Sequence, residues 1–151
     1  MRLSAEDRLE LLDAYGRYCH AFDSGDAQAA AGLFAEDGCF AYVGSRDFEG
    51  RAAIAGLFER RHAGAPGIRH FVSGIVVEPS PEGASGRAYA IVLRMGPGEP
   101  LRVITIGQYD DLWVRLAEGW RLKRRAFTAW LDPALIDAPL TAPTQSRDEP
   151  E

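Results

Sequence analysis

The chain has 151 residues, of which 46% are hydrophobic, and its formal net charge at pH 7 is −5. This length and apolar content predict one domain with its own core, and the acidic balance argues against nucleic acid or an anionic membrane as a partner. No apolar run approaches the roughly 18–20 residues of a membrane span, and the acidic N-terminus lacks the apolar segment of a signal peptide. We therefore expect a cytoplasmic protein.

The first half of the chain has the pattern of three helices and a short strand. Ser4 can cap a first helix that runs to about Phe22, and Asp26 can cap a second one after the turn at Gly25. We expect the other elements of this half at 27–34 (helix), 39–43 (strand), 47–49 (short strand) and 51–62 (helix).

From residue 68 onward the hydrophobic period changes from 3.6 to 2, which indicates strands. We expect strands at 68–77, 87–95, 101–116 and 120–131, with a bend or bulge near Gly107. Helices followed by long antiparallel strands predict an α+β domain, with helices on one face of a curved sheet that encloses a small-molecule pocket. Residues 1–135 form this domain, and the Pro-, Ala- and charge-rich residues 136–151 are expected to be a disordered tail.

Asp23 stands where the first helix should present a hydrophobic side chain. At 100° per residue it falls on the apolar arc formed by Leu9, Leu12, Tyr15, Cys19 and Phe22. A carboxylate on a core-facing arc is costly without partners. Either the helix ends earlier and Asp23 caps a turn, or Asp23 faces a cavity that uses it; the spacing leaves both open.

His70 lies by strand alternation on an apolar face, which it shares with Ile68, Val72 and Val76. A neutral imidazole there can act as a base if a carboxylate fixes its tautomer, and Asp23 is the candidate. Tyr18 and Tyr42 are candidate hydrogen-bond donors to a carbonyl or a leaving hydroxyl. The alternative is ordinary packing: a satisfied core histidine and half-buried tyrosines.

Charged residues on the later strands leave further choices. Asp110 and Asp111 must face opposite sides of a regular strand, and we favour Asp111 on the inner side. Arg121, Lys123 and Arg125 alternate, which predicts a solvated or subunit-facing side of the last strand. With neither a His-x-His motif nor paired cysteines, the sequence predicts no metal site.

The order of several motifs resembles the nuclear transport factor 2-like superfamily, in its SnoaL-like branch. These motifs are Asp23-x-x-Asp26 after a helix, Leu33-Phe-x-x-Asp37, Gly50-Arg-x-x-Ile54, Arg69-His-Phe71, Gly107-x-Tyr-x-Asp111 and Gly119-Trp-Arg121 with Arg125. The resemblance covers about residues 5–131, and the branch is similar to scytalone dehydratase, bile acid 7-alpha-dehydratase and polyketide cyclases. It implies a cone-shaped fold and a homodimer or homotrimer.

The resemblance also implies roles for single residues. In the dehydratases an aspartate at the end of the first helix works with a histidine on the strand after the third helix, and Asp23 and His70 occupy those places. Tyr42 matches a catalytic tyrosine of scytalone dehydratase, and Tyr18 matches one of bile acid dehydratase. The chain departs from scytalone dehydratase in having no second histidine on the third long strand.

Three further residues are expected to contact the substrate. Asp111 is the nearest match to an aspartate of bile acid dehydratase, Phe22 replaces a tyrosine of scytalone dehydratase, and Trp130 could close the cavity. The expected function is a cofactor-independent acid/base dehydratase or isomerase acting on a small hydrophobic or aromatic ketone, cyclic or polyketide-like. A polyketide-type cyclase using the same pocket and a non-catalytic binding module are the alternatives.

Overall fold

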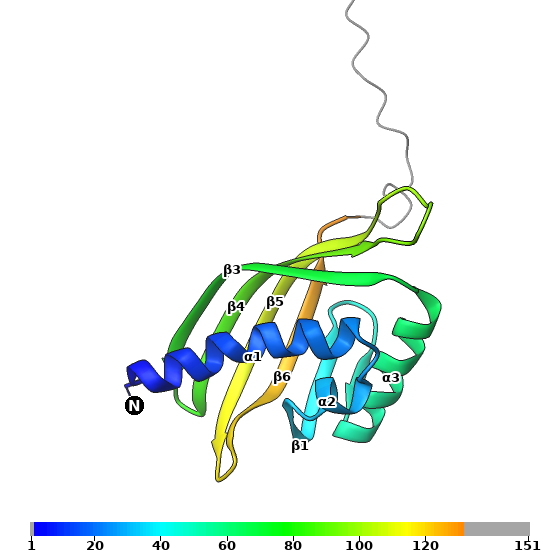
Figure 1. Ribbon diagram of the computed structural model, residues 1–151. Coiled ribbons are helices and arrows are strands. Elements are labelled where there is room, and N and C mark those ends of the chain that lie inside the picture. Colours follow the sequence, from blue (N-terminus) through cyan, green and yellow to red (C-terminus); the bar gives the residue numbers. More distant parts are fainter. Residues whose placement is uncertain (1, 132–151) are drawn as a thin grey trace, which may run out of the picture.

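A computed structural model describes residues 2–131 as three helices on one face of a six-stranded sheet (Figure 1). The helices are α1 (Ala5–Asp23), α2 (Ala27–Ala31) and α3 (Arg51–Gly64). The strands are β1 (Phe34–Tyr42), β2 (Asp47–Glu49), β3 (Ile68–Ser80), β4 (Gly83–Arg94), β5 (Arg102–Leu116) and β6 (Gly119–Ala129). The expected α+β architecture is confirmed, while the tail expected at 136–151 lies outside the described residues.

The start of α1 is fixed by a reciprocal cap. The Ser4 hydroxyl accepts from the Asp7 N–H at 3.0 Å, and the Asp7 carboxylate accepts from the Ser4 N–H at 2.9 Å. The helix buries Leu11, Ala14, Tyr15, Tyr18 and Phe22 against the sheet. Leu9 and Leu12 are exposed, so the buried stripe is rotated from the predicted arc. Asp23 consequently lies at the margin of this stripe.

The segment after α2 differs from the prediction. The helix expected at 27–34 ends at Ala31, and the strand expected at 39–43 begins earlier, at Phe34. Phe34 is fully buried and its ring contacts those of Phe40 and Phe58. One more turn of an alanine-rich helix would not bury as much apolar surface. Tertiary packing thus overrides local helix propensity here.

The sheet order is β2-β1-β6-β5-β4-β3, and every neighbouring pair is antiparallel except β1 and β6. Strand β3 therefore forms a free edge. It carries a bulge, because its pairing with β4 shifts register between Ser73 and Val76, where Gly74 has a φ of +60°. The bulge expected near Gly107 lies three residues before it, because the pairing of β5 with β4 shifts register at Ile104, between the paired residues Val103 and Thr105. Gly107 itself pairs regularly, and a Cβ there would lie 2.1 Å from the Thr128 carbonyl oxygen. That glycine serves close packing of the backbone instead.

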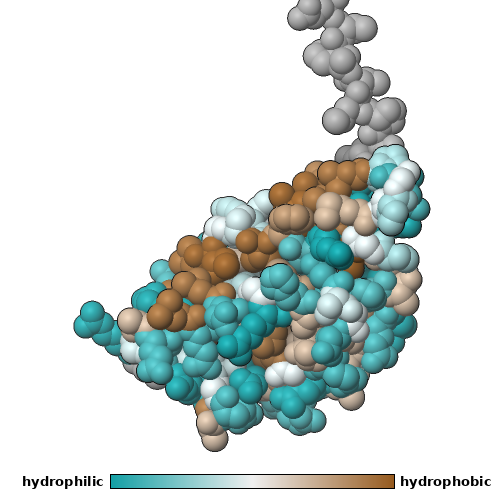
Figure 2. Space-filling view, viewed as in Figure 1, coloured by the Kyte–Doolittle hydropathy of each residue, from teal (hydrophilic) through white to brown (hydrophobic). Residues whose placement is uncertain are grey.

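The face of the sheet turned away from the helices carries exposed apolar side chains, among them Phe71, Tyr89, Ile91 and Trp130. In the view of Figure 2, hydrophobic surface follows the upper edge of the molecule, where Figure 1 places β3, while the lower part is mainly hydrophilic. Self-association as a homodimer or homotrimer stays a prediction that this surface would suit. Within residues 2–131, no helix combines the length and apolar character needed to cross a membrane.

Candidate active site

A cavity of about 340 Å³ lies between the helices and the concave face of the sheet. Its wall is mostly aromatic and aliphatic, with a few polar groups. The lining residues are Tyr18, Phe22, Phe40, Tyr42, Arg61, Ile68, His70, Val92, Ile104, Thr105, Tyr109, Phe127 and Ala129. An apolar cavity with few polar groups is typical of a small-molecule site.

The expected pairing of His70 with Asp23 is present at one side of this cavity. His70 Nδ1 lies 2.6 Å from Asp23 Oδ1, and the backbone N–H of His70 donates to Asp23 Oδ2 at 2.8 Å. The side chains are 5% and 13% exposed, respectively. Asp23 is the last residue of α1 and is not among the residues that line the cavity, so it supports His70 from behind. Neither simple alternative for Asp23, a turn cap or a cavity-facing acid, describes this arrangement.

This geometry assigns the tautomer of the neutral imidazole. An ionised carboxylate can only accept hydrogen bonds, so Nδ1 carries the proton that Asp23 receives. The lone pair is then on Nε2, the other ring nitrogen of a residue that lines the cavity. His70 is thereby prepared to accept a proton from a bound molecule.

Two aromatic side chains of α1 hold the His70 ring in place. The centroid of the Phe22 ring lies 4.6 Å from that of His70, and the Tyr18 centroid lies 5.8 Å away in an edge-on arrangement. Burial raises the pKa of Tyr18 well above its ordinary value, so its hydroxyl stays protonated and can donate. Tyr18 and Phe22 therefore stand in the cavity wall beside the imidazole, as the sequence predicts.

Tyr42 also lines the cavity. Its ring contacts Phe40, Phe48 and Phe127, and burial raises its pKa while the neighbouring Arg61 acts against that shift. Tyr42 is thus a protonated donor that shares the cavity with His70 without contacting its ring in the described structure. Both predicted tyrosines therefore line one cavity with His70.

Asp111 points inward, as we favoured, but it does not line the cavity that contains His70. Its carboxylate accepts two hydrogen bonds from Arg125, at 2.9 and 2.8 Å, and both side chains are fully buried. The assignment of Asp111 to substrate binding is therefore corrected: its acceptors are taken by the guanidinium. Burial is the largest single effect and lowers the pKa of Arg125, but the charge and hydrogen bonds of Asp111, together with Tyr18 and Tyr109, outweigh it and the pKa is raised.

The Arg125 guanidinium lies under three tyrosines. It is 4.4 Å from the ring centroid of Tyr18, 4.2 Å from that of Tyr109 and 5.1 Å from that of Tyr15. These distances are those of cation–π contacts, which gain strength when the cation is desolvated. The Arg125–Asp111 pair thus supports two of the rings that line the cavity, those of Tyr18 and Tyr109.

Trp130 does not close the cavity and is corrected as a substrate contact. It is 53% exposed and its ring lies 5.4 Å from Tyr89 on the other face of the sheet. Strand alternation explains this position, because Phe127 and Ala129 line the cavity and the residue after Ala129 must turn away.

Sequence reasoning missed three polar cavity residues, Tyr109, Arg61 and Thr105. Tyr109 is buried and contacts Tyr18 and Phe127; its position two residues before Asp111 places it on the same face, which was a usable signal. Arg61 lies in the last turn of α3, outside the apolar stripe that defined that helix, and no local pattern pointed to it.

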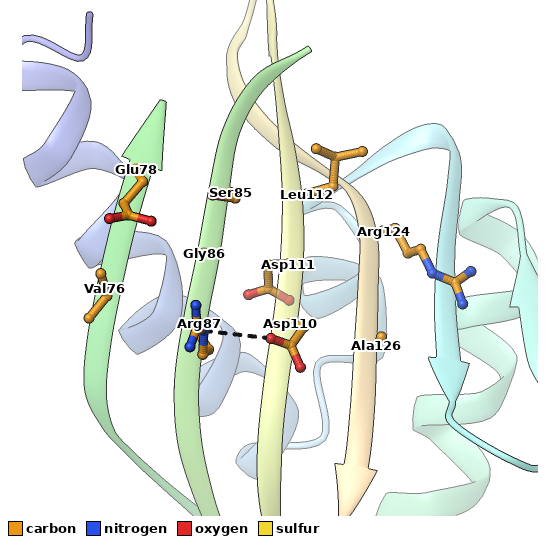
Figure 3. A pocket seen from close by; sticks show the side chains of 10 residues that line it. All are labelled: Val76, Glu78, Ser85, Gly86, Arg87, Asp110, Asp111, Leu112, Arg124 and Ala126. Atoms are coloured by element: carbon orange, nitrogen blue, oxygen red, sulfur yellow. Dashed lines mark ion pairs between the residues drawn. The ribbon is translucent and has the colours of Figure 1, made fainter. Parts of the chain in front are cut away.

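A second hollow of about 300 Å³ lies on the sheet itself, lined from β3 to β6 (Figure 3). Arg87 and Asp110 face each other in it at 3.8 Å, and Glu78 and Arg124 add one charge of each sign. Asp111 is a third carboxylate among the residues that line this hollow, and it is paired with the buried Arg125. Across residues 2–131, no three His, Cys, Asp or Glu side chains come together as a metal ion would require.

Comparison with known proteins gives a family. The model of the SnoaL-like domain matches residues 3–126. The fold is similar to that of an NTF2-like protein with a cystatin-like fold from Novosphingobium aromaticivorans, which is 32% identical (TM-score 0.75; 91% of this chain and 90% of that one covered).

Two other proteins of that organism also have this fold. A candidate aromatic ring hydroxylase is 27% identical (TM-score 0.75; 87% and 94% covered). A candidate scytalone dehydratase is 24% identical (TM-score 0.71; 85% and 89% covered). This second similarity extends to the fold and not to the activity. No curated protein matches the sequence.

Proposed function

The chain belongs to the SnoaL-like domain family, within the NTF2-like fold, and on this premise we propose that it is a cofactor-independent acid/base enzyme, a dehydratase or isomerase of a cyclic or polyketide-like ketone. One observation carries the proposal: a cavity-lining histidine is held by a carboxylate so that its second nitrogen is free to accept a proton. The open cavity in front of His70 distinguishes it from a structural histidine that is enclosed by packed side chains.

In the proposed reaction, His70 Nε2 removes the proton on the carbon next to the substrate carbonyl. The electron pair of that C–H bond moves into an enolate, whose oxygen accepts a hydrogen bond from a protonated tyrosine; Tyr18, whose ring contacts His70, is the nearest candidate. Asp23 stabilises the imidazolium that forms. Tyr42 is a second donor that lines the same cavity.

The fate of the enolate separates dehydration from isomerisation. In dehydration, the enolate expels a hydroxyl from the next carbon, and the imidazolium returns its proton to that oxygen, so that water leaves and a double bond remains. In isomerisation, the same proton returns to a different carbon of the conjugated system. Both outcomes need only one base that holds and returns one proton.

Two alternatives use the same cavity. In a polyketide-type cyclase, the enolate carbon attacks a second carbonyl of the same substrate instead of expelling a hydroxyl. In a binding module, no proton is removed at all. The similarity to a candidate aromatic ring hydroxylase does not favour either alternative, because that name describes the other protein.

Proton exchange tests the proposal without knowledge of the natural substrate. The purified protein is incubated with 2-tetralone in D₂O, and loss of the proton signals next to the carbonyl is followed by NMR. We expect catalysed exchange in the wild type and a decrease of roughly 10²–10⁴-fold in His70→Ala. His20→Ala, which replaces an exposed histidine of α1 that does not line the cavity, is the control. Equal exchange in the wild type and His70→Ala would refute the assignment of the base.

A further inference from the structure

Arg61 is an exposed cation at the cavity wall that has no acidic partner within residues 2–131. Arginines elsewhere on the surface do form ion pairs, as Arg115 does with Asp7 and Arg124 with Asp47. The Arg61 guanidinium instead lies over the Tyr42 ring, 5.1 Å from its centroid. The feature that distinguishes Arg61 is its place in the wall of a mostly apolar cavity, in a chain with a net charge of −5.

Stacking on Tyr42 prepares Arg61 to bind an anion. Arg61 contacts the Tyr42 ring and also acts on the Tyr42 hydroxyl through a hydrogen bond. A guanidinium has five N–H donors, so others remain available in the planar fork that matches a carboxylate. Tyr42 is held protonated by its burial, so its hydroxyl can donate to the same anion. One charged fork and one hydroxyl would thus meet a carboxylate at this wall.

The rest of the cavity separates this cation from the base. Ring contacts run from Tyr42 through Phe127 and Tyr109 to Tyr18, which contacts His70. These rings form an aromatic wall that connects a proton acceptor, His70, with a cation, Arg61. A flat ring system lying along this wall would place a substituent near each of them.

We propose that the substrate is an aromatic or alicyclic keto acid, whose ionised carboxylate is bound by Arg61 and Tyr42 while its enolisable carbon faces His70. This inference rests on the proposed function, because it names the substrate class of the same cavity. The carboxylate orients the molecule, so that Arg61 acts as a specificity-determining residue. His70 and Asp23 remain the proton-transfer pair.

Binding of two matched probes tests this inference separately from catalysis. 2-Naphthoate carries the carboxylate, and 2-naphthamide is its neutral counterpart of the same shape; calorimetric titration gives the affinity of each. A hydrogen bond to a charged group is worth enough that we expect the wild type to prefer naphthoate by about tenfold or more. Arg61→Gln should abolish this preference, and added salt should weaken it.

Three further variants separate the possible outcomes. Arg60→Gln, which removes the neighbouring charge of α3 but does not line the cavity, should keep the preference. Arg61→Lys should keep part of it, because the charge remains and the fork is lost. His70→Ala should lose proton exchange and keep the preference, so a failure of the proposed function and a failure of carboxylate binding give different results. Equal wild-type affinity for both probes, or a preference that survives in Arg61→Gln, would overturn the inference.

Discussion

Replacing Asp23 with asparagine should reverse the tautomer of His70. Asp23 now accepts twice, from the His70 backbone N–H and from Nδ1. An asparagine side chain has one acceptor and one donor group. The backbone N–H can only donate, so the amide oxygen must turn to it and the NH₂ group must face Nδ1. Nδ1 then has to accept, and the ring proton moves to Nε2, which becomes a donor where the proposed reaction needs a base.

The cost in stability should be small and the cost in activity large. The backbone hydrogen bond is kept, and the bond to Nδ1 changes from charge-assisted to neutral, a loss of about 1–1.5 kcal/mol. The variant also no longer has to bury a charge in a side chain that is only 13% exposed, and this gain offsets part of the loss. The melting temperature should therefore fall by no more than about 5 °C. Proton exchange of 2-tetralone should fall by roughly 10²–10⁴-fold, because the base is lost.

The tautomer can be measured directly by NMR of ¹⁵N-labelled protein, since the two imidazole nitrogens differ in shift according to which one carries the proton. Asp26→Asn is the matched control: Asp26 accepts from the Ala29 N–H at 2.9 Å as the cap of α2, a position where asparagine serves as well as aspartate. An Asp23→Asn protein that keeps the Nδ1–H tautomer, or keeps wild-type exchange, would refute this reasoning.

Two more predictions concern charges away from His70. Asp111→Leu leaves Arg125 buried without its partner and should lower the free energy of unfolding by about 3–5 kcal/mol, whereas adding Arg125→Met should recover much of it. Urea unfolding followed by tryptophan fluorescence measures both, and a double variant as unstable as the single one would contradict the account. Hydrogen bonds from Ser4, first the hydroxyl and then the backbone N–H, lower the pKa of Asp7 from 3.8 to about 2. The pKa of Asp7 is lower in the folded state than in the unfolded state, so this stabilisation is present above pH 3.8 and is lost as the pH falls toward 2. Asp7→Asn should therefore make the melting temperature fall less steeply between pH 3.8 and 2. An unchanged slope in this variant would contradict the prediction.

The predicted proton-transfer pair could be found from sequence because each partner is fixed by a short-range pattern. A helical period placed Asp23 beside the buried stripe, and a strand period placed His70 on the inner face. The family resemblance then joined two residues that are 47 positions apart. The residues around this pair, Phe22 and Tyr18, followed from the same helical period.

Arg125 shows why other residues could not be predicted. Counting by twos put it on one solvated face with Arg121 and Lys123, and it is instead fully buried with Asp111. The pairing of β5 with β6 shifts register at Lys123, which lies between the paired residues Leu122 and Arg124, and this extra residue turns Arg125 to the inner face. A bulge of this kind is set by contacts between strands, which a single strand's pattern does not contain.

The free edge formed by β3 has consequences for how the molecule meets its own copies. An open strand edge is a template on which another chain can add a strand. In its second half, β3 is irregular: Gly74 interrupts the ladder, Pro79 has no N–H to offer, and the Arg8 guanidinium occupies the Val77 carbonyl at 2.9 Å. Its first half pairs regularly with β4 from Ile68 to Ser73, and His70 lies there. The two halves of β3 thus have different roles. The irregular second half discourages the addition of another strand, whereas the regular first half fixes the position of the His70 imidazole.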